Sequence, residues 1–240
     1  RVGHVQHGQM QFIAHFFQPR EDLLAPGRVQ RCHRLVKQQT FAIVHQGTRQ
    51  THQFLLTKGD VIHIGIGGSD FGPRLAIEAL AHVPNIESRG MRMHFLANID
   101  TADLNRILHR ALPNSTRVII VSKSFTTLET TMNAKAVVAW LKGSGCTHSQ
   151  IEHALYAVTA NIPAAKDFGV SEDNIFPFWD WVGGRTSELC AVGLLPAALQ
   201  GLDIDAMLAG AKACDEITRQ PDTAQNPAAQ LALMWQDRKS

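Results

Sequence analysis

The sequence predicts an α/β protein whose parallel sheet is covered by helices on both faces. From residue 60 onward, short runs of β-branched and apolar residues alternate with helical stretches, which is typical of such sheets. Loops rich in glycine and hydroxyl groups follow the first and third of these runs. The chain has 240 residues, of which 45% are hydrophobic and 18% charged, so the composition is globular and excludes wholesale disorder. No apolar run approaches the ~20 residues that a membrane span needs, so we expect no membrane partner.

Residues 1–59 differ in composition from the rest of the chain. They carry eight basic and two acidic residues, a net charge of +6, whereas residues 60–240 have a net charge of −4. Their apolar residues follow no steady period, so we set this Gln- and His-rich segment apart from a domain over 60–240. A basic arm that binds nucleic acid is an alternative, but no known binding motif supports it. The histidines lack the spacing of a metal site, so we expect no metal.

The alternating pattern predicts each element in turn. The predicted strands cover residues 61–66, 91–97, 117–122 and 154–159, with a short fifth strand over 175–178. The predicted helices run from Pro73 to about residue 82, over about 102–111, 127–141, 187–200 and 204–219, and onward from Asn226-Pro227. Thr126 and Glu129 have the spacing of a capping box. In a parallel sheet, ligands bind outside the carboxyl ends of the strands, where the loops lie.

The first loop, GIGGSDFGP over 65–73, matches no nucleotide fingerprint. Asp70 stands where a dinucleotide loop needs glycine, and Pro73-Arg74 stand where a P-loop needs Lys-Ser/Thr. A turn dense in glycine remains, which lets a ligand approach bare backbone N–H groups, and Ser69 adds a hydroxyl. The alternative is a tight strand-to-helix turn without a ligand.

The second loop, SKSFTT over 122–127, places four hydroxyls and one ammonium before a predicted helix. Helix N-termini favour anions, and hydroxyls donate to phosphate oxygens. Because no Walker pattern or acidic metal ligand accompanies the loop, it predicts a small phosphorylated metabolite rather than a nucleoside triphosphate. Ordinary helix capping is the alternative.

The third stretch, FPFWDWVGGRTS over 176–187, carries a glycine pair and Arg185 ahead of a helix predicted to start near Ser187. A guanidinium at that N-terminus, facing the same pocket, suits an oxyanion or enediolate formed during a reaction. A structural arginine is the alternative.

Three segments, VIHIGIGGSDFGP, VSKSFTTLETTMNA and FWDWVGGRTSELCAVGL, resemble the first half of the glucose-6-phosphate isomerase family. The resemblance covers about residues 59–240. It implies a SIS domain, which is a three-layer parallel sheet, and the interconversion of glucose 6-phosphate and fructose 6-phosphate through a cis-enediolate in glycolysis and gluconeogenesis. It also implies a homodimer when full length and no metal or organic cofactor. The four cysteines form no CxxC motif, which fits a reducing compartment, so we expect a cytoplasmic protein.

The resemblance also assigns roles to individual residues. Those that it implies bind the phosphate group are Ser122, Lys123, Ser124 and Thr127. It implies that Gly68 and Ser69 line the sugar and that Arg185 stabilises the enediolate.

The sequence departs from the family pattern in substitutions and in missing motifs. Ser124 replaces a usual threonine, Leu128 a frequent glutamine, and Thr186 an aromatic residue, without removing a charge. The family's catalytic Glu, His and Lys lie in motifs that this chain does not contain, and we interpret Glu129 as a capping residue. Residues 1–59 do not resemble the family. We therefore expect a fragment that is inactive alone.

Two alternatives remain open. The chain could be a non-catalytic SIS module that senses a sugar phosphate or mediates assembly, although such a module has less need of Arg185. An amino-sugar isomerase or synthase with a related domain has no reason to carry the FWDWVGGR stretch.

Overall fold

A computed structural model describes residues 59–82 and 91–237 of the chain. Within these ranges the predicted α/β fold is confirmed, because five parallel strands form one sheet in the order β2-β1-β3-β4-β5. The strands are β1 (Asp60–Ile64), β2 (Arg92–Leu96), β3 (Thr116–Val121), β4 (Leu155–Thr159) and β5 (Ile175–Pro177). Every strand overlaps the range predicted for it.

Eight α-helices are described. They are α4 (Gly68–Ala79), α5 (Thr101–Leu108), α6 (Leu128–Gly143), α7 (His148–Ala154), α8 (Ile162–Phe168), α9 (Ala191–Gln200), α10 (Ile204–Thr218) and α11 (Pro227–Asp237). Three 3₁₀ turns accompany them: η1 (Pro113–Ser115), η2 (Glu172–Asn174) and η3 (Gly184–Thr186). Helices α7 and α8 were not predicted from the sequence, because each is seven residues long and too short for a clear helical period.

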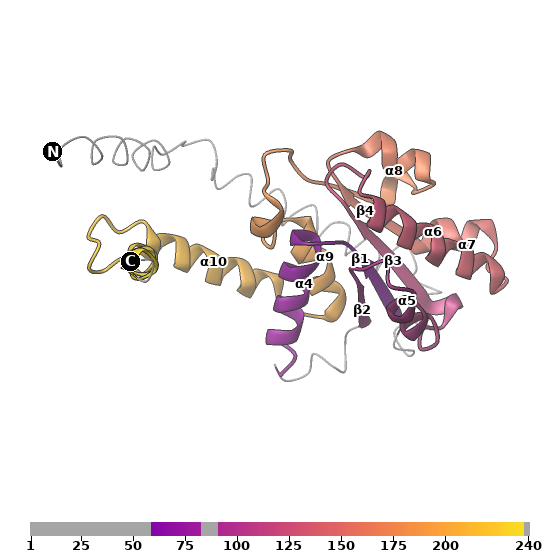
Figure 1. Cartoon of the computed structure of the whole chain (residues 1–240), viewed down its shortest axis with the longest axis horizontal. Helices are drawn as coiled ribbons and strands as arrows, with labels where there is room; N and C mark the ends of the chain where they lie inside the picture. The colour runs from indigo at the N-terminus through magenta and orange to yellow at the C-terminus, as the bar shows by residue number, and fades with distance from the viewer. Residues whose placement is uncertain (1–58, 83–90, 238–240) are drawn as a thin grey trace.

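The helices cover both faces of the sheet, which makes three layers (Figure 1). Successive side chains of a strand point to opposite faces, so Val61 and Ile62 of β1 enter different cores. Ile62 packs in a core with α5, α6, α7 and α8. Val61 packs in a second core with α9 and the segment before it, and α4 joins the same face through Ile77.

The structure corrects three predicted helix starts. Helix α4 begins at Gly68 rather than Pro73, because Gly67 adopts a φ of 59° that turns the chain directly from strand to helix. The capping box at Thr126 and Glu129 is wrong, since α6 takes Thr127 as N-cap without a side-chain bond. A capping box does form at α7, between Thr147 and Gln150.

The third correction concerns the segment around Arg185. Residues Gly184–Thr186 form the separate turn η3, and α9 begins only at Ala191. Arg185 therefore does not lie at the N-terminus of a helix that starts near Ser187.

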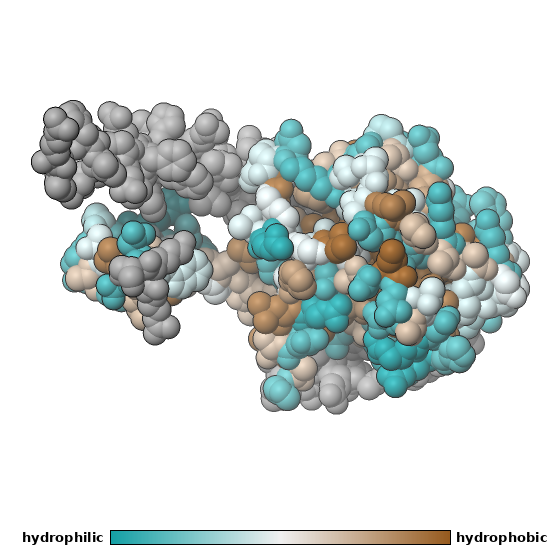
Figure 2. Space-filling view, in the orientation of Figure 1, coloured by the Kyte–Doolittle hydropathy of each residue, from teal (hydrophilic) through white to brown (hydrophobic). Residues whose placement is uncertain are grey.

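The last two helices project from the domain. Helix α10 leads away from the sheet to α11, which has no buried residue (Figure 1). Apolar side chains also gather among polar ones on the face between α4 and α6 (Figure 2). Among the described helices, none combines the length and apolar character needed to cross a membrane.

Candidate functional site

The two glycine- and hydroxyl-rich loops leave neighbouring strands. The first loop follows β1 and the second follows β3, and β1 pairs with β3 in the middle of the sheet. After β1 the chain forms β2 on one side of β1, and it then crosses to form β3 on the other side. The gap between β1 and β3 is therefore the switch point of this strand order. Both predicted ligand loops therefore lie at the place where such sheets bind ligands.

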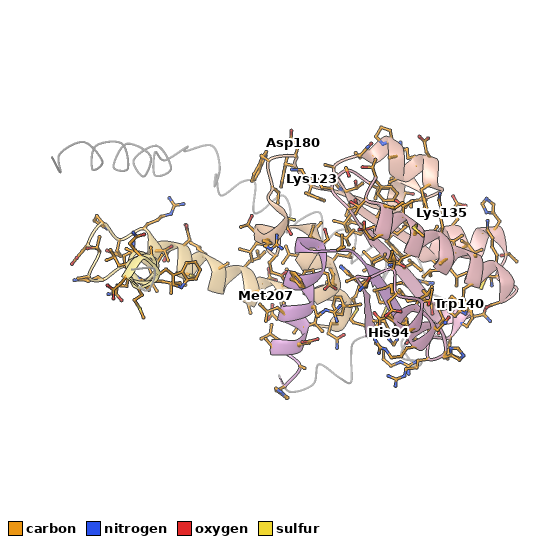
Figure 3. The ribbon with its side chains drawn as sticks, in the orientation of Figure 1. His94, Lys123, Lys135, Trp140, Asp180 and Met207 are labelled. Atoms are coloured by element: carbon orange, nitrogen blue, oxygen red, sulfur yellow. The ribbon has the colours of Figure 1, made fainter. Side chains whose placement is uncertain are left out.

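The third stretch leaves the edge strand β5 and reaches both loops. A Cβ atom built on Gly68 would lie 2.1 Å from the carbonyl carbon of Gly184, so the two backbones are in close contact. Lys123 Nζ donates to the carbonyl oxygens of Asp180 and Val182, the latter at 3.4 Å. Figure 3 shows Lys123 beside Asp180 at this end of the sheet. The structure thus brings all three predicted motifs together.

Hydroxyl groups of the second loop hydrogen-bond to one another. Ser122 Oγ lies 3.2 Å from Thr127 Oγ1 and accepts a 3.1 Å bond from the backbone N–H of Phe125. Phe125 has a φ of 57°, an unusual conformation for a residue other than glycine. Ser124 Oγ accepts bonds from the N–H and the hydroxyl of Thr126, at 3.3 and 2.7 Å. The buried Ser122 thereby holds the strained backbone that shapes the loop.

Residues at the end of β4 and just after it hydrogen-bond to the backbone of the second loop. The carbonyl oxygen of Lys123 accepts bonds from Thr159 Oγ1 and from the N–H of Ala160, both 3.1 Å long. Asn161 Nδ2 donates to the carbonyl oxygen of Ser124 at 3.0 Å. Because Thr127 makes no capping bond, the first turn of α6 keeps N–H groups that are not capped by its side chain. This geometry suits an anion.

Arg185 is exposed and stands over the start of α4. Its guanidinium carbon lies 6.0 Å from the ring centroid of Phe71, which is one turn into that helix. Ser69 belongs to the first turn of the same helix. The guanidinium of Arg185 on η3 and the hydroxyl of Ser69 on α4 therefore both lie near the loops.

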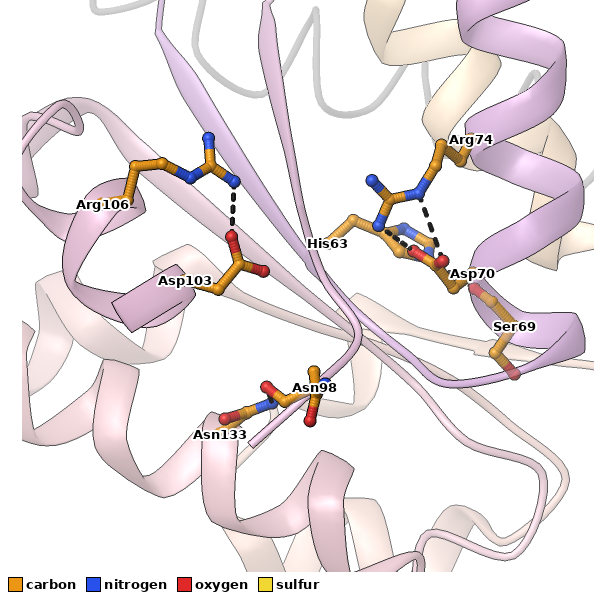
Figure 4. A network of polar contacts seen from close by, with 8 residues as sticks. All are labelled: His63, Ser69, Asp70, Arg74, Asn98, Asp103, Arg106 and Asn133. Carbon is orange, nitrogen blue, oxygen red and sulfur yellow. Dashed lines mark hydrogen bonds and ion pairs between the residues drawn. The ribbon is translucent and has the colours of Figure 1, made fainter. Parts of the chain in front are cut away.

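A hydrogen bond from the sheet stabilises the first turn of α4. Pro73 lies inside the helix and has no N–H to donate to the carbonyl oxygen of Ser69, four residues earlier. His63 of β1 supplies the missing bond, with Nε2 at 2.7 Å from that oxygen (Figure 4). Since a carbonyl oxygen only accepts, Nε2 carries the proton.

His63 is fully buried and uncharged. Burial lowers the pKa of His63 to about 4, and its Nδ1 atom has no hydrogen-bond partner among the described residues. The ring centroids of His63 and Phe95 lie 5.1 Å apart. The guanidinium carbon of Arg74 lies over the Phe95 ring, 4.9 Å from its centroid. Arg74 also binds both carboxylate oxygens of Asp70, at 2.8 and 3.2 Å.

Four residues of this region received no role from the sequence alone. They are His63, Phe71, Asn161 and Asp180, whose contacts position the loops. Only His63 had a visible signal, as a histidine inside an apolar strand followed by a helix that contains proline. Within the described ranges, no three His, Cys, Asp or Glu side chains gather in a way that could hold a metal ion.

The fold and the site define an α/β protein with loops converging at the switch point of a parallel sheet. The family model described as phosphoglucose isomerase matches residues 27–237. The chain belongs to the phosphoglucose isomerase family. The match includes residues 27–58, which lie outside the described residues, and the predicted boundary at residues 59/60 stays a prediction.

Individual relatives agree with the family model. The chain is 40% identical to a glucose-6-phosphate isomerase of Burkholderia multivorans over 88% of this chain and 38% of that protein. It is 42% identical to one of Cupriavidus metallidurans over 73% of this chain and 32% of the relative. The crystal structure of a glucose-6-phosphate isomerase from Chlamydia trachomatis matches with a TM-score of 0.66 at 25% identity, covering 84% of this chain and 37% of that chain. The chain thus spans about a third of the length of these relatives.

The hydrogen bond from His63 to Ser69 generates the first prediction. His63→Phe keeps an aromatic ring but leaves the Ser69 carbonyl without its partner, which should lower the free energy of unfolding by about 1–3 kcal/mol. Pro73→Ala restores the N–H that can donate to this carbonyl, so His63→Phe should cost less in the Pro73→Ala background. Urea unfolding of the four proteins measures the coupling, and purely additive effects would contradict the assignment.

The contact between Gly68 and Gly184 generates the second prediction. Gly68→Ala should lower the free energy of unfolding by about 1–3 kcal/mol, because the new methyl group meets backbone atoms that cannot move aside cheaply. The matched control is Gly210→Ala in α10, where a Cβ meets nothing within 4 Å. That control should gain about 0.5–1 kcal/mol. Equal thermal stability of the two variants would argue against the close approach.

Proposed function

We propose that this chain forms the sugar-phosphate-binding domain of an aldose–ketose isomerase that interconverts glucose 6-phosphate and fructose 6-phosphate. The observation that carries the proposal is the convergence of the three motifs, through Gly68 with Gly184 and through Lys123 with Asp180 and Val182. Family membership supports the substrate class and a place in glycolysis and gluconeogenesis. A SIS-type domain, a cytoplasmic location and a homodimer of the full-length protein belong to the same proposal.

The second loop binds the phosphate group in this proposal. Lys123 supplies a full positive charge, and the hydroxyls of Ser122, Ser124 and Thr127 together with the first turn of α6 supply donors. The close packing of the loop against the end of β4 supports this role, because a preorganised site loses little entropy on binding.

The first and third motifs bind the sugar. Gly68 and Ser69 line it from α4, and Arg185 stabilises the negative charge of a cis-enediolate formed at C1 and C2. Moving a proton between these carbons also needs a base beside the sugar. Glu188 lies three residues after Arg185, but both of its carboxyl oxygens are buried in the protein, so it is not that base.

The first test is turnover. A coupled assay with fructose 6-phosphate should show no conversion by the purified 240-residue chain above the buffer background, because the sequence lacks the motif in which the family resemblance places the catalytic glutamate. Calorimetry should nevertheless detect binding of fructose 6-phosphate. Robust conversion would mean that these 240 residues already contain a base, which would contradict the proposed inactive fragment. Binding without turnover even in a full-length protein would favour the non-catalytic module.

The second test removes the charge of the phosphate loop. Lys123→Ala should weaken the binding of fructose 6-phosphate roughly tenfold, since a charge-assisted hydrogen bond contributes about 1.5–3 kcal/mol. Lys135→Ala is the matched control, because Lys135 is an exposed lysine further along α6 (Figure 3). Calorimetric affinities that fall equally in both variants would contradict the role of Lys123.

A further inference from the structure

The carboxyl group of Glu188 is buried without a partner next to the turn that carries Arg185. Glu188 lies between η3 and α9, two residues after η3 ends. Both carboxyl oxygens are inaccessible to solvent and have no hydrogen-bond partner in the described part of the chain. Buried polar groups are almost always paired, so this exception needs an explanation.

Two glycines make room for this side chain. A Cβ atom on Gly72 of α4 would lie 2.5 Å from Glu188 Oε2, and one on Gly193 of α9 would lie 2.4 Å from its Cδ atom. The carboxyl group thus fills the space that the two glycines leave between the helices. Gly72 lies four residues after Gly68 and on the same face of α4. Glu188 is therefore one helical turn from the contact between Gly68 and Gly184.

The surroundings favour the uncharged form of the carboxyl group, which predominates below about pH 7. The titratable side chains on the elements packed here are Asp70, Arg74 and Glu78 on α4, Arg185 on η3, Asp60 and His63 on β1 and Cys190 at the N-cap of α9. Asp60 binds Arg92 and His94, and the thiol of Cys190 donates to the carbonyl oxygen of Ser187. Asp70 and Arg74 bind each other, Glu78 and Arg185 are exposed, and the buried His63 is neutral. Helix α9 contributes no charged residue. Burial alone raises the pKa of Glu188 from 4.5 to about 7.

We infer that Glu188 is a positioning residue for Arg185: its uncharged carboxyl group locks η3 against α4, and its ionisation loosens that turn and weakens binding of the sugar. The sugar-binding part of this inference rests on the proposed function. An ionised carboxylate without a partner cannot stay in a dry space between two helices, so it must draw water in or move out. Either change separates the glycine contact that fixes the place of Arg185.

The sign of the pH dependence follows from the raised pKa. The uncharged carboxyl group contributes stability that is complete below about pH 4.5 and is lost as the pH rises through about 7. His63 acts in the opposite direction, since its lowered pKa contributes stability that is present above about pH 6.5 and is lost as the pH falls through about 4. Of these two groups, only Glu188 changes its charge in the folded protein as the pH rises through about 7.

The test compares two ligands at about pH 6 and about pH 8.5, with the 240-residue chain and its Glu188→Gln variant. Inorganic phosphate and fructose 6-phosphate gain their second negative charge at different pH values, about 7 and about 6, so the ratio of their affinities is compared between the wild type and Glu188→Gln, in which the titration of the ligands is the same. As the pH rises, the ratio of the affinity for fructose 6-phosphate to that for inorganic phosphate should fall roughly fivefold to tenfold more in the wild-type chain than in Glu188→Gln. In Glu188→Gln, whose side chain is uncharged at every pH, the ratio should change only as far as the titration of the two ligands requires.

A matched control and a second variant separate positioning from stability. Glu78→Gln removes an exposed carboxylate of α4 and should keep the wild-type pH profile. Gly72→Ala places a methyl group where the Glu188 carboxyl group lies, so it should weaken sugar-phosphate binding at both pH values while phosphate binding stays unchanged. Equal pH profiles for wild type and Glu188→Gln would overturn the inference.

Hydrogen exchange tests the positioning without any ligand. At about pH 8.5 the backbone amides of residues 183–187 should exchange roughly fivefold faster in the wild type than in Glu188→Gln, with no difference at about pH 6. Equal exchange at both pH values would refute the inference even where sugar phosphates bind. Faster exchange without any sugar-phosphate binding would refute the proposed function and leave the locking of η3 by Glu188 standing.

Discussion

The carbonyl group of Ser69 is the point on which the site depends. Pro73 removes its helical partner, and His63 replaces that partner from the middle of β1. This bond fixes the start of α4 against the central strand of the sheet. The position of that first turn then decides where Gly68 meets Gly184 and where Phe71 lies beneath Arg185. A single bond between strand and helix therefore sets the place of a side chain more than a hundred residues later in the sequence.

Charge is distributed around this point in a consistent way. Lys123 and Arg185, the cations assigned to substrate, are exposed to solvent, where holding a charge costs little. Behind them, the lowered pKa of the buried His63 keeps this side chain uncharged at neutral pH, and the raised pKa of Glu188 keeps its carboxyl group mostly uncharged below about pH 7. Burial thus favours the neutral forms of these two groups behind two exposed cations.

The sequence predicted the strands and the loops because both depend on local signals. Apolar runs mark β1, β3 and β4, and glycines and hydroxyls mark the loops that follow. Helix starts were less predictable. The positive φ of Gly67 begins α4 five residues before the proline that seemed to mark its first turn, and Thr126 bonds to Ser124 instead of capping α6. These outcomes depend on contacts between segments distant in sequence or on competing side-chain bonds, which local patterns do not contain.

The departures from the family pattern fit the same logic. Ser124 acts through an oxygen that accepts two bonds from Thr126, so the methyl group of the usual threonine contributes nothing to that contact. Thr186, in place of an aromatic residue, donates its hydroxyl to the carbonyl oxygen of Gly183 at 3.2 Å and so closes η3 from within. Leu128 is 66% exposed beside the second loop, so it displaces no buried donor. Each change keeps the backbone path that the glycine contact and the buried Glu188 carboxyl group require, which is why substitutions within two of the three motifs leave their convergence intact.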